Sequence, residues 1–234
     1  IPQLRDTEKV LSSLNLNNTK TKLLAIIANE KGAINASNFD EINYLGYPFS
    51  ISEEFQKRNT NTTIEGSLVR LEKINNIANT KNKKLVIYIS MGFGNPYGEK
   101  WNPDIVTEWV ERLYRNFEIK TFSISDTIGC ANEEVVSYLF DALIPSMRMI
   151  EFGAHMHVLP HKVDQIFSSA YNAGCRRFDG AIRGLGGCPM AKDKLIGNMA
   201  TENIISWLDK NQINSGVNTN QFEMALNYSK SVIF

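Results

Sequence analysis

Two histidines stand two positions apart near the end of an apolar run, with Met156 between His155 and His157. Side chains two positions apart on a β-strand project from the same face, so the two imidazoles are expected to converge. A neutral imidazole is a good ligand for divalent transition-metal ions, and this spacing therefore indicates a metal site. The alternative is a pair of packed or hydrogen-bonded strand histidines. The third histidine, His161, begins the next predicted helix and is interpreted as a surface or capping residue.

A glycine-rich segment, residues 184–189 (GLGGCP), follows the last predicted strand and carries Cys188. Its glycines permit unusual backbone angles and a close approach to a ligand. A cysteine on such a segment can be brought over a bound substrate by loop closure. The alternative is a simple glycine turn with an incidental thiol. Cys130 and Cys175 lack this setting and are interpreted as small buried or partly buried hydrophobic residues.

Two more polar side chains occupy positions from which they could take part in chemistry. Asn198, next to Gly197 at the entry to a helix, is either an oxygen ligand for a metal ion or the cap of that helix. Asp126, at the end of a strand, either orients a catalytic group, binds a metal ion or caps the next helix. Barrels of the α/β class place their active sites at the carboxyl ends of strands, which favours a functional role for Asp126.

The chain that must position these residues alternates short apolar runs with amphipathic stretches. Most of the apolar runs are nearly continuous, as expected for parallel strands covered on both faces. A βα unit that repeats about every 30 residues predicts an α/β fold, either a doubly wound sheet or a barrel. Six runs predict strands, at residues 22–29, 41–46, 84–90, 120–125, 149–157 and 177–182.

The amphipathic stretches predict the helices. The clearest spans Asn102–Phe117, where Asn102 caps the helix and Pro103 fits the first helical position. Its apolar residues recur every four positions and form one stripe. Further helices are predicted at residues 63–79 and 133–144, and from Val163 to a stop at Gly174. Because no proline- or glycine-rich linker divides the chain, residues 1–234 are predicted to form a single domain.

The composition excludes several classes of protein. Of the 234 residues, 43% are hydrophobic, which suffices for one large core. The formal net charge is zero, and no long run of lysine or arginine indicates binding to nucleic acid or to a membrane surface. No apolar stretch is long enough to span a membrane, and no signal peptide is visible. Three cysteines are an odd, sparse set, which argues against a disulfide scaffold and for a reducing compartment.

The number of predicted strands leads to an expectation about the amino terminus. A complete eight-stranded barrel needs two strands more than the six counted here. The helical pattern near residues 6–14 looks like the return helix of a strand that precedes Ile1. We therefore expect a (β/α)8 barrel whose first two strands are missing from the sequence.

Residues 184–191 (GLGGCPMA) and 197–202 (GNMATE) closely resemble the cysteine-loop signature of the 3-hydroxy-3-methylglutaryl-CoA (HMG-CoA) lyases. The resemblance covers nearly the whole chain, because residues 52–64, 94–100 and 126–129 and the histidine pair follow in the family's order. The cysteine loop is highly specific. The histidine pair and the Asp126 motif are shared more widely in the DRE-TIM metallolyase superfamily, which has the TIM (β/α)8 barrel fold.

The resemblance implies roles for individual residues. His155, His157 and Asn198 would bind a magnesium or manganese ion. Cys188 would be the loop cysteine needed for catalysis, and His155 and Asp126 would take part in proton transfer. Four further residues would contact the substrate or support the site: Tyr88 on the wall, Glu202 behind a metal-binding histidine, and Gly186 and Gly187 in the cysteine loop.

The activity implied by the resemblance is cleavage of HMG-CoA, an acyl-CoA thioester, to acetyl-CoA and acetoacetate, as in leucine degradation and ketone body metabolism. A homodimer is implied as well, and a bacterial-type cytoplasmic location is preferred to the mitochondrial matrix. Val158 stands where the family usually has an aspartate, and the family's remaining metal ligand, an aspartate on its first strand, has no match here. The alternatives are a related Claisen- or aldol-type enzyme for another 3-hydroxyacyl or 2-oxo acid substrate, or a non-catalytic barrel homologue.

Overall fold

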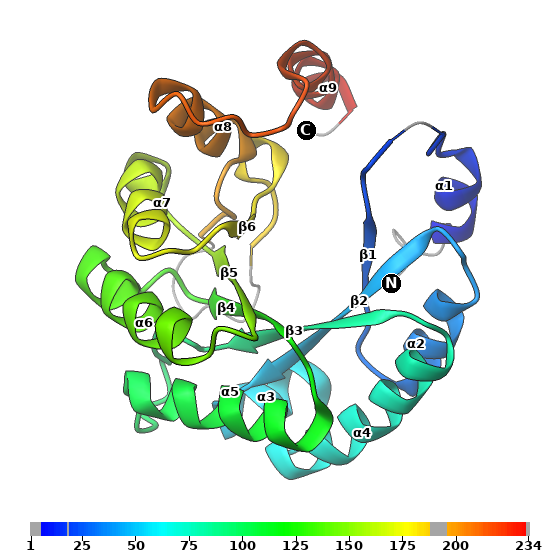
Figure 1. The fold of residues 1–234 in the computed structure, drawn as a ribbon, viewed down its shortest axis with the longest axis vertical. Coiled ribbons are helices and arrows are strands. Elements are labelled where there is room, and N and C mark those ends of the chain that lie inside the picture. Colours follow the sequence, from blue (N-terminus) through cyan, green and yellow to red (C-terminus); the bar gives the residue numbers. More distant parts are fainter. Residues whose placement is uncertain (1–5, 18, 188–195, 233–234) are drawn as a thin grey trace.

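The computed structural model describes residues 6–17, 19–187 and 196–232. In these residues, six parallel strands form one sheet in the order β1 to β6. The strands curve around a common interior and helices cover their outer face, so the described chain is an α/β half-barrel of TIM-barrel type (Figure 1). The strands are β1 Leu23–Ile26, β2 Ile42–Ser50, β3 Lys84–Ser90, β4 Thr121–Asp126, β5 Glu151–Met156 and β6 Arg177–Asp179.

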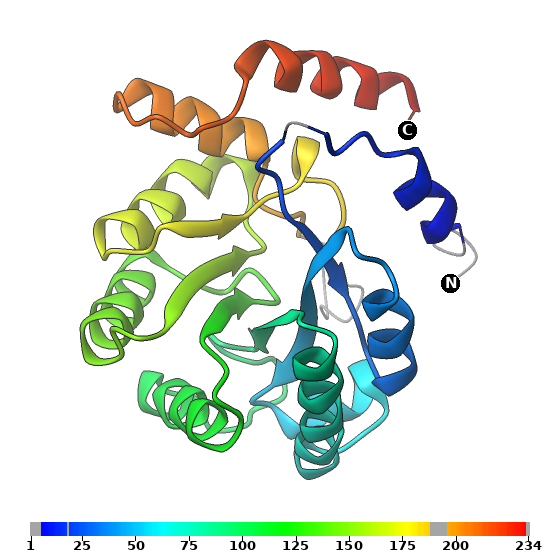
Figure 2. The same cartoon turned by 45° about the vertical axis from the view of Figure 1, so that its right-hand side comes forward.

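Helix α1 precedes the first strand, the other helices lie between and after the strands, and α8 and α9 extend the outer layer beyond β6 (Figure 2). They are α1 Thr7–Ser13, α2 Glu30–Ser37, α3 Glu53–Thr60, α4 Ile64–Thr80, α5 Pro103–Phe117, α6 Glu133–Ser146, α7 Val163–Asn172, α8 Thr201–Lys210 and α9 Thr219–Val232. The six predicted strands and the predicted helices are confirmed. Helices α2, α3 and α9 are additional to the predicted set, and α2 and α3 have only eight residues each. None of the helices in the described ranges is long and apolar enough to cross a membrane.

Side-chain alternation along β2 separates the core from the interior of the half-barrel. Tyr47 and Phe49 are fully buried on the outer face, where helices α2, α3 and α4 cover the strand. Pro48, between them, points inward and lines a cavity, and so does Tyr88, its register partner in β3. The core therefore lies between sheet and helices, while the inner face is left for the site.

Strand β2 continues four residues beyond its predicted end at Gly46. A proline inside a parallel strand usually removes a ladder hydrogen bond, so Pro48 argues against the extension. Strand β1, however, pairs with β2 only as far as Gly46, and from Tyr47 onward the β2 register continues with β3 alone. On the side of Pro48 that faces β1 there is therefore no paired strand, so the missing N–H of Pro48 costs no ladder hydrogen bond.

Strands β1 and β6 are the two ends of the sheet among the described residues. Strand β6 is shorter than predicted, because the chain turns after Asp179 and Ala181 pairs instead with Ala200 in an isolated bridge. Among the residues that the structure describes, β1 and β6 pair only with β2 and β5 respectively. Two further strands before β1, and a single domain over residues 1–234, stay predictions.

Candidate active site

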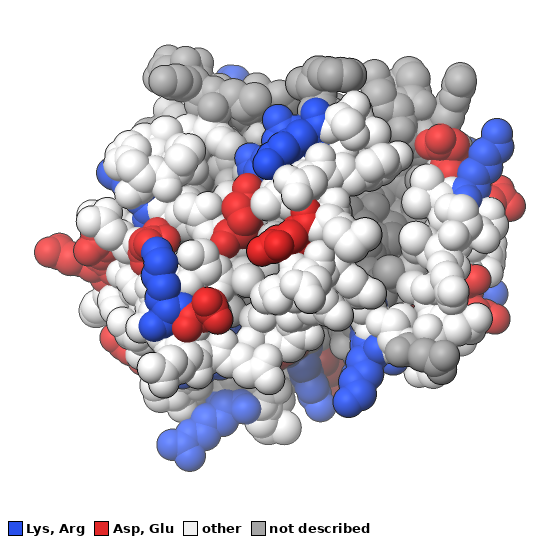
Figure 3. All heavy atoms as spheres, turned by 90° about the horizontal axis from the view of Figure 1, so that it is seen from above, with Lys and Arg blue, Asp and Glu red and all other residues white. Residues whose placement is uncertain are grey.

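A cavity of about 620 Å³ occupies the interior of the half-barrel. Charged side chains of both signs are interspersed over the face seen from above, as the zero net charge of the chain leads one to expect (Figure 3). Polar lining residues come mostly from β3 to β6 and apolar ones mostly from the side of β1 and β2. The polar ones include Tyr88, Ser90, Ser125, Thr127, His155, His157, Arg177 and Asp179, and the apolar ones include Leu24, Ile26, Pro48 and Phe55, with Phe178 of β6 in addition.

His155 and His157 both line this cavity, as their spacing predicts. His155 is the fifth residue of β5, and His157 follows the last residue of the strand. Their ring centroids are 5.5 Å apart and the ring planes are nearly perpendicular, at 83°. The side chain of His155 is 30% exposed, whereas His157 is buried. The two rings are therefore close enough to bind one ion together.

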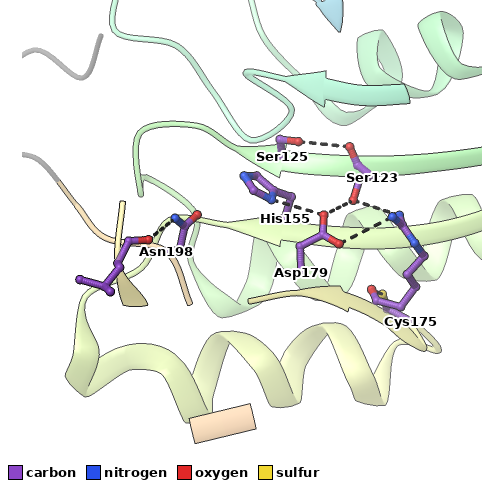
Figure 4. Close-up of polar contacts among 8 residues, drawn as sticks. Ser123, Ser125, His155, Cys175, Asp179 and Asn198 are labelled. Atoms are coloured by element: carbon purple, nitrogen blue, oxygen red, sulfur yellow. Dashed lines mark hydrogen bonds and ion pairs between the residues drawn. The ribbon is translucent and has the colours of Figure 1, made fainter. Parts of the chain in front are cut away.

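The Nδ1 atom of each histidine faces an oxygen of the protein. His157 Nδ1 is 3.2 Å from the carbonyl oxygen of Ile196. His155 Nδ1 is 3.3 Å from Asp179 Oδ2, as Figure 4 shows. Burial, followed by the charge of His155, lowers the pKa of His157, which favours a neutral ring. In a neutral ring that donates from Nδ1, the Nε2 lone pair is the one that can bind a metal ion.

Asn198 lies beside His157 because the two residues pair in an isolated antiparallel bridge. Its side-chain Nδ2 donates to the carbonyl oxygen of Leu185 at 2.7 Å (Figure 4). Because the amide nitrogen is engaged, the side-chain oxygen is the atom left to act as a ligand. The structure thus brings together the three metal ligands that the resemblance implies.

The glycine loop closes tightly on Asn198. Gly184 has a φ of +61°, and a Cβ added there would lie 2.8 Å from the carbonyl oxygen of Asn198. A Cβ at Gly186, whose φ is +89°, would lie 2.9 Å from Asn198 Nδ2. Both the positive φ angles and the close approach of Asn198 therefore favour glycine at these positions. The next part of the loop, with Cys188, lies outside the described residues, and its catalytic role stays a prediction.

Asp126 is buried at the end of β4 but does not line the cavity. Its Oδ1 accepts the backbone N–H of Cys130 at 3.0 Å, and its Oδ2 accepts that of Ala131 at 2.8 Å. Burial raises its pKa, and these hydrogen bonds partly oppose the rise. Both oxygens thus hold the loop after β4, whereas the next helix, α6, is capped by Asn132 and not by Asp126. Its role in proton transfer stays a prediction.

The other residues implied by the resemblance occupy different places around the site. Tyr88 lines the cavity and presents its ring edge to His155, with centroids 5.4 Å apart at 89°. Burial and the charge of Asp179 raise the pKa of Tyr88 to about 12, so its hydroxyl is protonated at neutral pH. Glu202 Oε2 accepts the backbone N–H of Arg183 at 3.0 Å and thereby holds the turn that leads into the glycine loop.

Three polar residues that were not predicted from the sequence lie beside His155: Asp179 and Arg177, which line the cavity, and the buried Ser123. Asp179, at the end of β6, contacts His155 and also accepts a hydrogen bond from Ser123 at 3.0 Å (Figure 4). Arg177 precedes it by two positions and points into the same cavity. Burial raises the pKa of Asp179, but His155, Arg177 and Ser123 outweigh burial and lower it. The signal in the sequence is the pair of charged residues, two apart, in an otherwise apolar strand.

The donor atoms fit a divalent ion in type but not in charge. Among the described residues, no three His, Cys, Asp or Glu side chains converge as metal ligands would. An ion at the end of β5 would therefore be held by the imidazoles of His155 and His157 and the amide oxygen of Asn198. This set is neutral, whereas a site for magnesium normally includes a carboxylate.

Comparison with known proteins places these residues in context. The HMGL-like family model matches residues 5–228. Hydroxymethylglutaryl-CoA lyase YngG of Bacillus subtilis is 32% identical over 217 residues, which cover 93% of this chain and 71% of YngG.

Two solved structures have the same fold. The crystal structure of the B. subtilis HMG-CoA lyase has a TM-score of 0.88 and 31% identity, covering 99% of this chain and 76% of that one. An HMG-CoA lyase from A. baumannii, in complex with coenzyme A and 3-methylmalate, has a TM-score of 0.86 and 26% identity, covering 99% of this chain and 74% of that one.

Proposed function

Because the chain belongs to the HMGL-like family, we propose that it is a divalent-metal-dependent carbon–carbon lyase that cleaves HMG-CoA to acetyl-CoA and acetoacetate. The observation that carries the proposal is that His155 and His157 line the interior cavity together, with Asn198 paired to His157 beside them. The relatives named above are HMG-CoA lyases, and one of them binds coenzyme A. An acyl-CoA thioester is therefore the proposed substrate class.

We propose that the ion is magnesium or manganese, held by His155 Nε2, His157 Nε2 and Asn198 Oδ1. When bound, such an ion supplies Lewis acidity that stabilises negative charge on the substrate's hydroxyl and carbonyl oxygens. Zinc fits less well, since an amide oxygen and the oxygens of the substrate favour a harder cation. The neutral charge of the three ligands calls for a carboxylate as well, and an aspartate on a preceding strand stays a prediction.

The proposed reaction takes a proton from the substrate hydroxyl, breaks one carbon–carbon bond and delivers a proton to C2, after which the proton held by the base restores the donor. A base takes the proton of the tertiary hydroxyl, and the oxygen electrons form the ketone of acetoacetate. The bond between C2 and C3 breaks, and its electron pair stays on C2 as the enolate of the thioester. C2 then takes up a proton to give acetyl-CoA. Cys188 is the proposed donor, since an ordinary thiol pKa of about 8.5 keeps it mostly protonated at neutral pH.

His155 and Asp126 are the proposed groups for the transfer of the hydroxyl proton. His155 Nδ1 faces Asp179, so a single lone pair, on Nε2, must serve either the metal ion or the proton. The two roles of His155 therefore exclude each other at any one moment. Burial raises the pKa of Asp126, and its oxygens must leave the loop N–H groups before it can exchange a proton.

The deciding experiment is an assay of the full-length protein with HMG-CoA, with and without magnesium or manganese. We expect acetyl-CoA and acetoacetate in equal amounts, loss of activity after treatment with a chelator, and recovery when the metal is returned. A synthase would instead consume acetyl-CoA with a 2-oxo acid, and a non-catalytic barrel would do neither. Homodimerisation and a cytoplasmic location belong to the same proposal, and the dimer is checked by the mass of the protein in solution.

A further inference from the structure

Asp179 and His155 are direct partners across two neighbouring strands. The register of β5 and β6 pairs them, and both side chains line the interior cavity. Asp179 Oδ2 lies 3.3 Å from His155 Nδ1. That nitrogen is buried and has no aligned hydrogen-bond acceptor among the described residues. A small rotation of the imidazole would therefore let His155 Nδ1 donate a hydrogen bond to Asp179.

An arginine sets the direction of the hydrogen bonds around Asp179. A guanidinium group has donors only, and Arg177 Nη1 donates to Ser123 Oγ at 3.3 Å. The hydroxyl proton of Ser123 therefore points elsewhere, and it is donated to Asp179 Oδ2 at 3.0 Å. Arg177 Nη2 also lies 3.6 Å from Asp179 Oδ1. Ser123 thus holds Oδ2 of Asp179, and Arg177 holds Oδ1.

The hydrogen bonds from Arg177 through Ser123 to Asp179 leave one consistent position for the proton on the His155 ring. An ionised carboxylate can only accept, so the imidazole nitrogen that faces it must carry a proton. With the proton on Nδ1, the lone pair of the neutral ring is on Nε2. A carboxylate behind an imidazole is also a common way in which proteins orient a metal-binding histidine.

We propose that Asp179 is a positioning residue, which fixes the orientation of the His155 ring and its Nδ1–H tautomer, and that Arg177 and Ser123 hold Asp179 in place. The value of this tautomer for binding a metal ion rests on the proposed function. The tautomer itself is a property of the chain alone. Arg177 has a second effect, because its positive charge offsets the cost of burying the Asp179 carboxylate.

The spectroscopic test observes the imidazole nitrogens of the full chain by NMR with labelled histidine. The chain has only three histidines, so the spectrum of His155→Asn identifies the His155 signals by their loss. In the wild type we expect a protonated Nδ1 and an unprotonated Nε2. In Asp179→Asn the amide can donate to Nδ1, so the proton should move to Nε2. Ser123→Ala keeps the carboxylate but removes the hydroxyl that holds it, so Asp179 can turn away from Nδ1 in part of the molecules and both tautomers should be present.

The second readout is the affinity for Mn²⁺ measured by calorimetry. Asp179→Asn should weaken binding by about 10- to 100-fold, the usual effect of removing the partner of a metal-binding histidine. Ser67→Ala is the matched control for Ser123→Ala. It removes a fully buried hydroxyl that bonds to Tyr47, away from the cavity, and should leave the tautomer and the affinity unchanged.

The inference is overturned if His155 keeps the Nδ1–H tautomer in both Asp179→Asn and Ser123→Ala. If Asp179→Asn does not fold, Ser123→Ala decides alone, and an unchanged His155 signal there overturns the inference. The test is separate from that of the proposed function. A wild type that does not cleave HMG-CoA, with a tautomer change in Asp179→Asn, would overturn the proposed function and support the positioning role. If the wild type cleaves HMG-CoA but the His155 tautomer is unchanged in the variants, the proposed function is supported and the positioning role is overturned.

Discussion

The backbones of His157 and Asn198 are joined as an antiparallel bridge, so the segment that carries Asn198 is fastened to the end of β5. Two further backbone hydrogen bonds flank this bridge, from Val158 N to Gly197 O and from Met199 N to Met156 O, both at 3.0 Å. One ligand of the proposed metal site is therefore placed by main-chain pairing to another. Main-chain pairing to the end of β5 therefore holds Asn198 in position.

Replacing Asn198 should separate its two functions. Asn198→Ala removes both the side-chain oxygen and the donor to Leu185, and we expect Mn²⁺ affinity to fall by roughly tenfold or more. Asn198→Asp keeps an oxygen and adds a negative charge to a neutral ligand set, so it should bind Mn²⁺ more tightly than the alanine variant. Calorimetric titration measures both. Equal affinities of wild type and Asn198→Ala would contradict Asn198 as a ligand.

Stability should depend on pH through His157. Burial and the charge of His155 lower the pKa of this ring in the folded state, whereas the unfolded value is about 6.5. Above that pH both states hold a neutral ring, and His157 makes no contribution to the pH dependence. As the pH falls through this value, the unfolded state takes up a proton that the folded state does not, so the free energy of unfolding decreases.

The measurement for His157 is urea unfolding of wild type and His157→Asn at about pH 7.5 and about pH 5.5, on either side of the unfolded pKa. The wild type should lose more free energy of unfolding between the two pH values than the variant does. Titration of the carboxylates is common to both proteins and cancels in the comparison. An identical loss in both would show that the His157 pKa is not lowered by folding.

The amino terminus of α5 offers a prediction about stability away from the site. Asn102 Oδ1 accepts the backbone N–H of Ile105 at 2.9 Å and caps the helix. Asn102→Ala should lower the free energy of unfolding by about 1 kcal/mol, whereas Asn102→Asp should retain most of it. Chemical denaturation of the three proteins checks this. A loss in the aspartate variant as large as in the alanine variant would argue against the cap.

The elements could be predicted from the sequence where local rules decide them. Strand Lys84–Ser90 is a continuous apolar run with its predicted bounds, and α5 has both its cap and its first-turn proline. The end of β2 could not be predicted, because the tolerance of Pro48 depends on where the neighbouring strand β1 stops. That is a property of strand pairing and not of the run itself.

The site could be predicted only in part, for the same reason. The shared face of His155 and His157 follows from their spacing in one strand. The role of Asp179 depends on the β5–β6 register, and Arg177 reaches over Gly153, where a Cβ would lie 2.8 Å from its Nη1. No local pattern contains such a contact. The engagement of Asp126 by the loop after β4 likewise depends on the path of the backbone.

The role of Cys188 is tested by its removal. If it supplies the final proton, Cys188→Ala should reduce turnover sharply while leaving Mn²⁺ affinity unchanged, because the thiol is not a metal ligand in the proposed mechanism. Cys175→Ala is the control, since that thiol is buried and does not line the interior cavity. Steady-state assays with HMG-CoA and calorimetry give the two readouts. Wild-type turnover in Cys188→Ala would refute the proposed role.

The glycine loop supports a last prediction, in which backbone strain and steric clash are separated. Gly184 and Gly216 have similar positive φ angles, +61° and +72°. A Cβ at Gly216 meets nothing within 4 Å, whereas a Cβ at Gly184 would lie 2.8 Å from the carbonyl oxygen of Asn198. Alanine at either position should lower the free energy of unfolding by about 1 kcal/mol through backbone strain. Only Gly184→Ala should also push Asn198 away from His157.

We therefore expect Gly216→Ala to lower the free energy of unfolding by about 1 kcal/mol and to bind Mn²⁺ like the wild type. Gly184→Ala should lose a similar or larger free energy and also weaken Mn²⁺ binding by roughly tenfold, because a metal site tolerates little displacement of a ligand. Urea unfolding and calorimetry on the same samples give both quantities. Undiminished Mn²⁺ affinity in a folded Gly184→Ala protein would show that the close approach of the loop does not position Asn198.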